Sequence, residues 1–78
     1  MTMIELFARQ LPWPTAWDEV YGRTAPLLME IGFGGGHFLL DLARRRPSAN
    51  ILGIEIALPG IRRAVQTLTM AGVSNGRV

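Results

Sequence analysis

The sequence predicts an α/β fold built around a parallel sheet, and three observations support this prediction. Two short apolar runs, Leu27–Ile31 and 51–56, each carry a carboxylate close to the end of the run. A glycine-rich loop at 32–36 follows the first run, and a stretch with helical periodicity follows each run. Alternating strands and helices are typical of α/β folds with parallel strands. We therefore expect the first half of a doubly wound sheet, with helices on both faces.

The N-terminal 25 residues are expected to form a helical extension and a linker rich in proline and tryptophan. Apolar residues recur there at helical spacing: Met3, Ile4, Phe7, Ala8 and Leu11. This spacing predicts a short amphipathic helix, which Pro12 and Pro14 would end because proline lacks a backbone donor. A further helical turn is expected over Trp17–Tyr21.

Residues 26–78 are expected to form a partial α/β domain. The run 27–31 lacks polar alternation before Glu30, which predicts a strand buried on both faces. A helix is expected from 37 to 46, because Pro47 disfavours its continuation. A second strand is expected over 51–56, and then a helix that starts at Pro59 and stops at Gly72. Its predicted buried stripe is Ile61, Ala64, Val65, Leu68 and Ala71 or Gly72. Arg77-Val78 would open a third strand.

Length and composition exclude several classes of protein and site. The chain has 78 residues, half or less of a usual domain, so we expect a truncated α/β fold. It has no cysteine, which excludes disulfides and cysteine-based zinc or iron–sulfur sites. No apolar run is long enough to span a bilayer, and the start lacks the pattern of a signal peptide. A cytoplasmic protein without a membrane partner is therefore expected.

The charge of the chain is too small to argue for nucleic-acid binding. The net charge is +2, and all eight basic residues are arginine, which suits phosphate contact. Residues 44–46 could touch RNA phosphates, but a solvated helix end that complements the helix dipole is the favoured interpretation. Arg62 and Arg63 follow Pro59-Gly60 near the expected cofactor edge of the sheet, and their role stays open.

The glycine loop favours one class of cofactor over another. A dinucleotide fingerprint counted from Gly32 needs a third glycine at position 37, where this chain has His37. The pattern that fits is acid-x-G-x-G-x-G, formed by Glu30, Gly32, Gly34 and Gly36. Glu30 would repel a pyrophosphate but attract the ammonium and sulfonium of S-adenosylmethionine. The alternative is an ordinary glycine turn in which Glu30 pairs with an arginine.

A second acid supports a nucleoside-containing cofactor. Glu55 lies at the end of the second apolar run, where an acid accepts hydrogen bonds from ribose hydroxyls in such folds. We include Glu55 and the adjacent Ile56 among the candidate cofactor-binding residues. Dinucleotide sites use the same device, and a merely solvated carboxylate is the plainer alternative.

Other chemistry-bearing residues carry weaker signals. His37 could act as a base, but a packing or capping role at the start of its helix is favoured. Trp13 and Trp17 could stack on a base, but a packed N-terminal extension is favoured. We find no cluster with metal-ligand spacing and no nucleophile–base pair. No metal site is therefore expected.

Much of the chain resembles the bacterial tRNA (guanine-N7-)-methyltransferase family. The matching stretches are Leu28-Met29-Glu30-Ile31-Gly32-Phe33-Gly34-Gly35-Gly36 with Phe38-Leu39, then Ala43, Pro47, Asn50-Ile51-Leu52-Gly53-Ile54-Glu55-Ile56, Pro59-Gly60, Ala71-Gly72 and Asn75. The family pattern is L-E-I-G-F-G-x-G, then P…N-F-x-G-I-E, then P-G and a-G-x-x-N-v-r-v. The phrase E-I-G-F-G followed by G-I-E is more specific than a general methyltransferase motif.

The resemblance implies a Rossmann-like, S-adenosylmethionine-dependent enzyme that methylates N7 of a guanosine in the tRNA variable loop. Residues 26–78 would be part of its cofactor-binding domain, and tRNA would be the substrate of the full-length enzyme. Glu30 and Glu55 match the family's first two cofactor-binding acids, and Gly32, Gly34 and Gly36 match its loop.

One departure and several absences accompany the resemblance. Gly76 replaces an apolar residue of the family, which would weaken the third strand. The later cofactor acid, the catalytic aspartate and the Pro-Asp-Pro-Trp segment fall beyond Val78, so no catalytic residue is assigned and the chain is expected to be inactive alone.

Two alternative functions stay open, namely a methyltransferase with another substrate and a non-enzymatic interaction fragment. The sequence leaves the oligomeric state undetermined.

Overall fold

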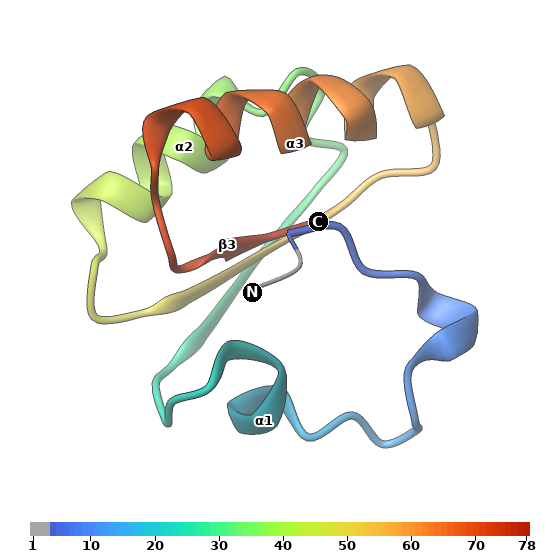
Figure 1. Ribbon diagram of the computed structural model, residues 1–78, viewed down its shortest axis with the longest axis vertical. Coiled ribbons are helices and arrows are strands. Elements are labelled where there is room, and N and C mark those ends of the chain that lie inside the picture. The colour runs from blue at the N-terminus through green and yellow to red at the C-terminus, as the bar shows by residue number, and fades with distance from the viewer. Residues whose placement is uncertain (1–3) are drawn as a thin grey trace.

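A computed structural model describes residues 4–78, and the predicted role of Met3 lies outside the described residues. Its elements, in chain order, are η1 (Ala8–Gln10), α1 (Trp17–Tyr21), β1 (Leu27–Ile31), α2 (His37–Arg45), β2 (Asn50–Ile54), α3 (Leu58–Ala71) and β3 (Gly76–Arg77). Strands and helices alternate from β1 to β3, as the sequence predicts (Figure 1).

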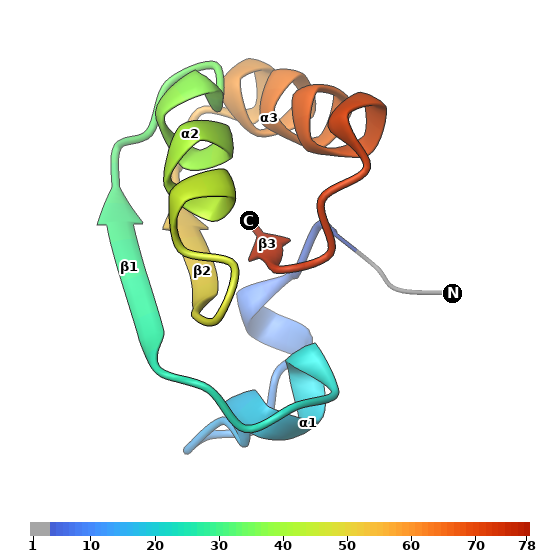
Figure 2. The ribbon, with the colours of Figure 1, turned by 90° about the vertical axis from the view of Figure 1, so that its left-hand side faces the viewer.

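The three strands form one parallel sheet with β2 in the middle. The order is β1-β2-β3, with Leu28 opposite Ile51 in one pair and Ile51 opposite Gly76 in the other. Parallel neighbours need a crossover connection, and α2 and α3 supply the two crossovers. Both helices cover one face of the sheet, whereas α1 lies on the opposite side (Figures 1 and 2). The predicted partial Rossmann-like arrangement is confirmed.

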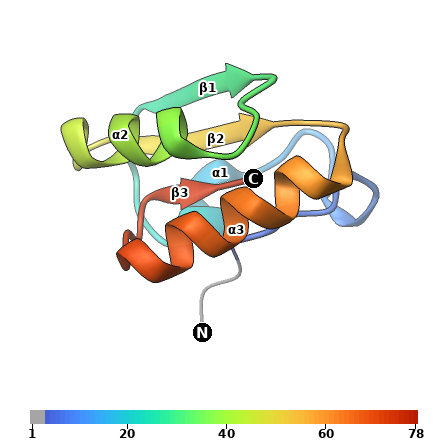
Figure 3. The same cartoon turned by 90° about the horizontal axis from the view of Figure 1, so that it is seen from above.

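The core lies between β2 and the helix pair. Seen from above, α2 and α3 lie side by side along the strands (Figure 3). Leu39 of α2, Ile51 of β2 and Leu68 of α3 are at most 1% exposed, and each buried aliphatic side chain contributes about 1.5–3 kcal/mol. Of the predicted stripe on α3, Ala64 and Leu68 are fully buried. The apolar periodicity of α3 therefore identifies its buried face correctly.

The prediction that β1 is buried on both faces is wrong. In the described structure β1 pairs only with β2, and Met29 and Ile31 are 51% and 73% exposed. Leu28, on the face of α2 and α3, packs against the core. The strand with the expected burial is β2, whose residues 50–53 are all buried. An apolar run therefore marks a strand here without revealing its position in the sheet.

The predicted N-terminal helix is also wrong. The structure has only the short 3-10 turn η1 in that segment. Before it, the chain runs beside the end of β3, where Leu6 N donates to Val78 O at 2.6 Å and Val78 N donates to Ile4 O at 2.9 Å. These bonds satisfy backbone groups that a helix would otherwise use, and a helix this short is costly to nucleate.

The helix α1 is fixed to the sheet by a buried tyrosine. The Tyr21 hydroxyl donates to the carbonyl of Ile51, and burial raises the pKa of Tyr21 far above its usual value. The guanidinium of Arg77 lies over the Tyr21 ring at 4.8 Å from its centroid. Arg23 adds a bond from Nε to Asn50 Oδ1 at 2.8 Å. The predicted turn at Trp17–Tyr21 is confirmed, and it anchors the face opposite α2 and α3.

Several element ends follow local signals. The helix α3 has proline in its first turn and ends at Gly72 in a left-handed conformation with φ 70°, both as predicted. The strand β2 ends at Ile54, two residues earlier than expected, and α2 ends at Arg45. Gly76 begins β3, and a Cβ there would lie 3.3 Å from Leu68 Cδ1. Within the described residues, no helix has the length and apolarity needed to cross a membrane.

Candidate functional site

The glycine loop between β1 and α2 is shaped by left-handed backbone conformations. Gly32, Gly34 and Gly36 have φ values of 71°, 64° and 90°. Residues other than glycine adopt such positive φ values only with backbone strain. Gly32 N donates to Ile54 O at 2.8 Å, so the loop leaves the sheet beside the end of β2. The three glycines predicted from the sequence are therefore required by the backbone itself.

The three glycines serve two different purposes. A Cβ on Gly36 would lie 2.7 Å from Ala64 Cα, so the start of α2 presses against the backbone of α3. A Cβ on Gly32 or Gly34 would meet nothing within 4 Å. The first two glycines therefore border open space, whereas Gly36 allows two helices to pack closely.

Glu55 is held against this loop as a charged group. Its Oε2 accepts hydrogen bonds from Ile56 N at 2.9 Å and Ala57 N at 3.2 Å. Bonds from the backbone of Ala57 and Ile56, with a smaller contribution from that of Gly34, lower the pKa of Glu55 below its usual value. Two of these donors share one oxygen, so the second carboxylate oxygen retains capacity to accept further hydrogen bonds.

Gly60 completes the junction between the loop and the start of α3. A Cβ on Gly60 would lie 3.0 Å from Gly34 O and 3.6 Å from Glu55 Cγ. The glycine loop, the acid after β2 and the first turn of α3 therefore meet at the carboxyl end of the sheet. Our sequence reasoning gave Gly60 no role at this junction, although Pro59-Gly60 at a helix start was a visible signal.

Glu30 occupies a separate position on β1. It stands opposite Gly53 in the strand register, and it is half-buried. The only ion pair among residues 4–78 joins Arg45 to Asp41, so Glu30 is not paired with an arginine there. This finding argues against the alternative in which Glu30 merely neutralises an arginine.

Two other candidate residues, Ile56 and His37, are exposed rather than packed in the core. Ile56 is 95% exposed beside Glu55, so its apolar side chain is available to a ligand rather than to the core. His37 begins α2 but makes no side-chain cap, and it is exposed. The favoured packing or capping role of His37 is therefore not seen. The arginines 44–46 are exposed, as expected for a solvated helix end.

The N-terminal segment encloses an apolar cavity on the sheet face opposite α2 and α3. The cavity has a volume of about 660 Å³. Its lining includes Trp13, Trp17, Met29, Leu52, Ile54 and Leu58, with Glu55 at one side. Trp13 is 72% exposed, so the expectation that it packs within the extension is wrong. Its indole Nε1 donates a hydrogen bond to Ala8 O at 3.4 Å.

The part of the chain that the structure describes contains no group of three or more histidine, cysteine, aspartate or glutamate residues able to hold a metal ion. The chemistry available at the carboxyl end of the sheet consists instead of a charged acid, backbone groups of a glycine loop, and apolar surface at Ile56. Such a set can bind a ligand with hydroxyl and cationic groups.

Comparison with known proteins places the chain among methyltransferases. Residues 24–78 match a family described as "Putative methyltransferase". Over 76 residues, the chain is 38% identical to a tRNA (guanine-N(7)-)-methyltransferase of Thermus thermophilus, a match that covers 97% of this chain and 24% of that protein. The protein of the same name from Aliivibrio salmonicida is 44% identical over 62 residues, 80% of this chain and 26% of the relative. The chain therefore spans about a quarter of the length of the curated relatives it matches.

Proposed function

The chain belongs to this family of putative methyltransferases, and from that premise we propose that it is the cofactor-binding part of an S-adenosylmethionine-dependent tRNA (guanine-N7-)-methyltransferase. The observation that carries the proposal is the junction of the glycine loop with Glu55, whose pKa is lowered by backbone donors. The names and the 38–44% identities of the relatives support the choice of tRNA as substrate.

The residues at this junction fit the proposed cofactor. Open space lies next to Gly32 and Gly34, so a ligand can approach the loop backbone closely. Glu55 is positioned to accept hydrogen bonds from ribose hydroxyls through its less engaged oxygen, and the exposed Ile56 offers apolar contact to an adenine ring. When bound, S-adenosylmethionine supplies an activated methyl group.

Glu30 suits the positive charge of this cofactor. It is half-buried on β1 and unpaired with any arginine among residues 4–78, so its charge is available to an ammonium group. A pyrophosphate would instead be repelled. This preference in charge favours S-adenosylmethionine over a dinucleotide at the same loop.

The proposed reaction places modest demands on acid–base chemistry. Guanine N7 carries a lone pair and no proton, so the enzyme needs to hold donor and acceptor in line rather than remove a proton. His37 is therefore not required as a base. We assign no catalytic residue within residues 1–78, and we propose that this chain by itself does not methylate tRNA.

Calorimetric titration of the chain with S-adenosylmethionine tests the proposal. We expect saturable binding, and Glu55→Ala should weaken it about ten- to a hundredfold because bonds to a charged acceptor are lost. Glu19→Ala is the matched control, since Glu19 is an exposed acid on α1, and it should bind as the parent does. Equal affinity of Glu55→Ala and the parent chain would contradict the assignment of Glu55.

The pH dependence of binding provides a second check. Because the pKa of Glu55 lies below its usual value, its carboxylate stays charged at every pH above that range. Affinity should therefore stay level from about pH 7 to about pH 5.5 and fall as the pH drops through the lowered pKa of Glu55. The same titration of Glu55→Ala should show a smaller acidic fall, because one of the two acids proposed to contact the cofactor is gone.

A further inference from the structure

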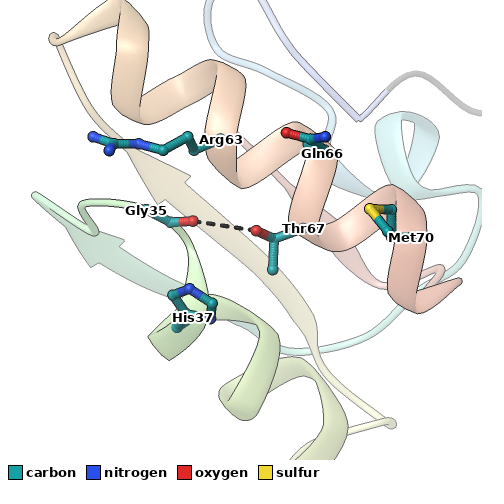
Figure 4. Close-up of a pocket in the computed structure, with 6 residues that line it drawn as sticks. All are labelled: Gly35, His37, Arg63, Gln66, Thr67 and Met70. Carbon is teal, nitrogen blue, oxygen red and sulfur yellow. Dashed lines mark hydrogen bonds between the residues drawn. The ribbon is translucent and has the colours of Figure 1, made fainter.

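A second groove lies between the start of α2 and the middle of α3. Its volume is about 430 Å³, and its lining consists of Gly35, His37, Arg63, Gln66, Thr67 and Met70. Figure 4 shows His37 on α2 facing the side chains that α3 contributes. The groove therefore joins the glycine loop to an exposed face of α3, outside the junction described for the cofactor.

The charge of this groove is positive. None of its lining residues is acidic, and the first turn of α2 carries no acid either. Among residues 4–78, Arg63 takes part in no ion pair, so its five N–H donors are available to a ligand. An uncompensated guanidinium in a concave site favours an anionic partner.

The hydrogen-bonding groups also favour an acceptor-rich ligand. The carbonyl of Gly35 already accepts a bond from Thr67 Oγ1 at 3.4 Å (Figure 4). That bond uses the hydroxyl proton of Thr67 and occupies the loop carbonyl. The donors that remain on side chains are those of Arg63 and Gln66 on α3, with His37 across the groove. A phosphate group, with several acceptor oxygens, matches these donors.

The position of the groove relates it to the cofactor junction. Arg63 lies one turn after Gly60, which contacts the glycine loop, so the groove opens at the carboxyl end of the sheet. An RNA that presents a base to the cofactor must pass its backbone close to the carboxyl end of the sheet. Residues 44–46 lie one helix length away from that end, at the other end of α2.

We propose that the groove between His37 and Arg63 binds a phosphate of the RNA backbone beside the cofactor site. The inference rests on the proposed function, because it takes the polyanion to be the tRNA substrate. The surface continues along α3, since Arg63, Gln66 and Met70 are spaced so as to share one face of the helix.

Fluorescence anisotropy with fluorescein-labelled, unmodified tRNA tests the groove. For the 78-residue chain at low salt, Arg63→Ala should weaken binding about tenfold and lower the slope of log K against log salt by about one, because one phosphate contact is lost. Arg63→Lys should restore most of the slope, since it keeps the charge. Arg44→Ala is the matched control and should change the affinity less than twofold.

The outcomes separate this inference from the proposed function. Parent-like tRNA affinity in Arg63→Ala, or no tRNA binding by the parent chain, overturns the groove. If Arg63→Ala weakens tRNA binding while calorimetry shows unchanged S-adenosylmethionine affinity, both proposals are supported. If the parent chain binds tRNA through Arg63 but fails to bind S-adenosylmethionine, the groove stands and the proposed function falls. If calorimetry shows that inorganic phosphate binds the parent chain but not Arg63→Ala at millimolar concentration, while tRNA does not bind, the site is one for a free anion and the proposal falls.

Discussion

Individual glycines have different structural roles in this chain. Gly32 and Gly34 keep an open surface on the loop, whereas Gly36 and Gly53 make room for neighbouring groups. A Cβ on Gly53 would lie 2.4 Å from Leu39 Cδ1, inside the core. Residues of one type, spaced closely in the sequence, therefore carry different physical roles.

Gly34 provides the sharpest residue-level prediction. Gly34→Val fills the open space beside the loop and adds strain at φ 64°, so calorimetry should show at least a tenfold loss of S-adenosylmethionine affinity. Gly72→Val is the matched control, because Gly72 has φ 70° and equally open surroundings at the far end of α3. Both variants should lose about 1–3 kcal/mol of unfolding free energy, but only Gly34→Val should lose binding. If Gly34→Val unfolds as easily as Gly72→Val and yet binds S-adenosylmethionine as the parent chain does, the loop assignment is rejected.

At the scale of residues, the sequence predicts chemical types better than contacts. The acid-x-G-x-G-x-G pattern predicts Glu30 and the loop as cofactor-binding candidates, and the strand end predicts Glu55, because these are local signals. The sequence does not reveal that the Glu55 carboxylate accepts hydrogen bonds from Ile56 N and Ala57 N, nor that Arg63 and His37 line one groove. The second relation joins side chains on two helices, which only the folded chain brings together.

The helices α2 and α3 pack through a close backbone contact between Gly36 and Ala64. The start of α2 lies against α3 where Gly36 meets Ala64, and that contact sets how near the two helices approach. Because both helices cover the same face of the sheet (Figure 2), the contact also determines how the glycine loop sits relative to Glu55. The geometry of the candidate site therefore depends on helix packing.

Gly36→Ala tests this dependence. A methyl group 2.7 Å from Ala64 Cα meets backbone rather than a flexible side chain, so the helices must separate. We expect a loss of more than about 2 kcal/mol in unfolding free energy by urea denaturation. Gly22→Ala, at φ 72° with nothing within 4 Å, bears only the backbone strain and should lose about 1–2 kcal/mol. Equal losses in the two variants would show that close packing at Gly36 is unimportant.

The elements that sequence reasoning predicted wrongly are those whose state depends on distant partners. The N-terminal segment has helical spacing, yet Ile4 and Leu6 bond to Val78, more than seventy residues away in the chain. The run 27–31 is apolar except for Glu30, yet in the described structure it forms an edge strand. Periodicity describes which residues prefer burial, whereas the sheet order decides which of them become buried.

Among residues 4–78, apolar side chains are exposed on the edge strand β1 and at the end of the central strand β2. Met29 and Ile31 on β1, together with Ile54, are 51%, 73% and 40% exposed, and the backbone of β1 has an unpaired side in the described structure. Unpaired edges with apolar side chains favour association between chains. The apolar cavity beneath the N-terminal segment adjoins the same face.

Sedimentation velocity tests this property of the whole molecule. We expect the parent chain to associate as its concentration rises, and Ile31→Lys should reduce association because a charge on an edge strand opposes pairing. Phe38→Lys is the control, since Phe38 is 53% exposed on α2 rather than on the edge strand, and it should associate as the parent does. A monomeric parent chain at high concentration would refute the prediction.

The sequence by itself determined the order of strands and helices, the glycine loop, the two acids and the resemblance to a methyltransferase family. These features arise from local rules: glycine permits positive φ, proline starts or stops helices, and apolar runs form strands. Only the tertiary structure decided that β2 is central, that Gly36 packs on Ala64, that the N-terminal segment joins Val78, and that His37 and Arg63 share a groove. Each of these depends on a contact between residues far apart in the chain, and the packing of the whole molecule selects such contacts.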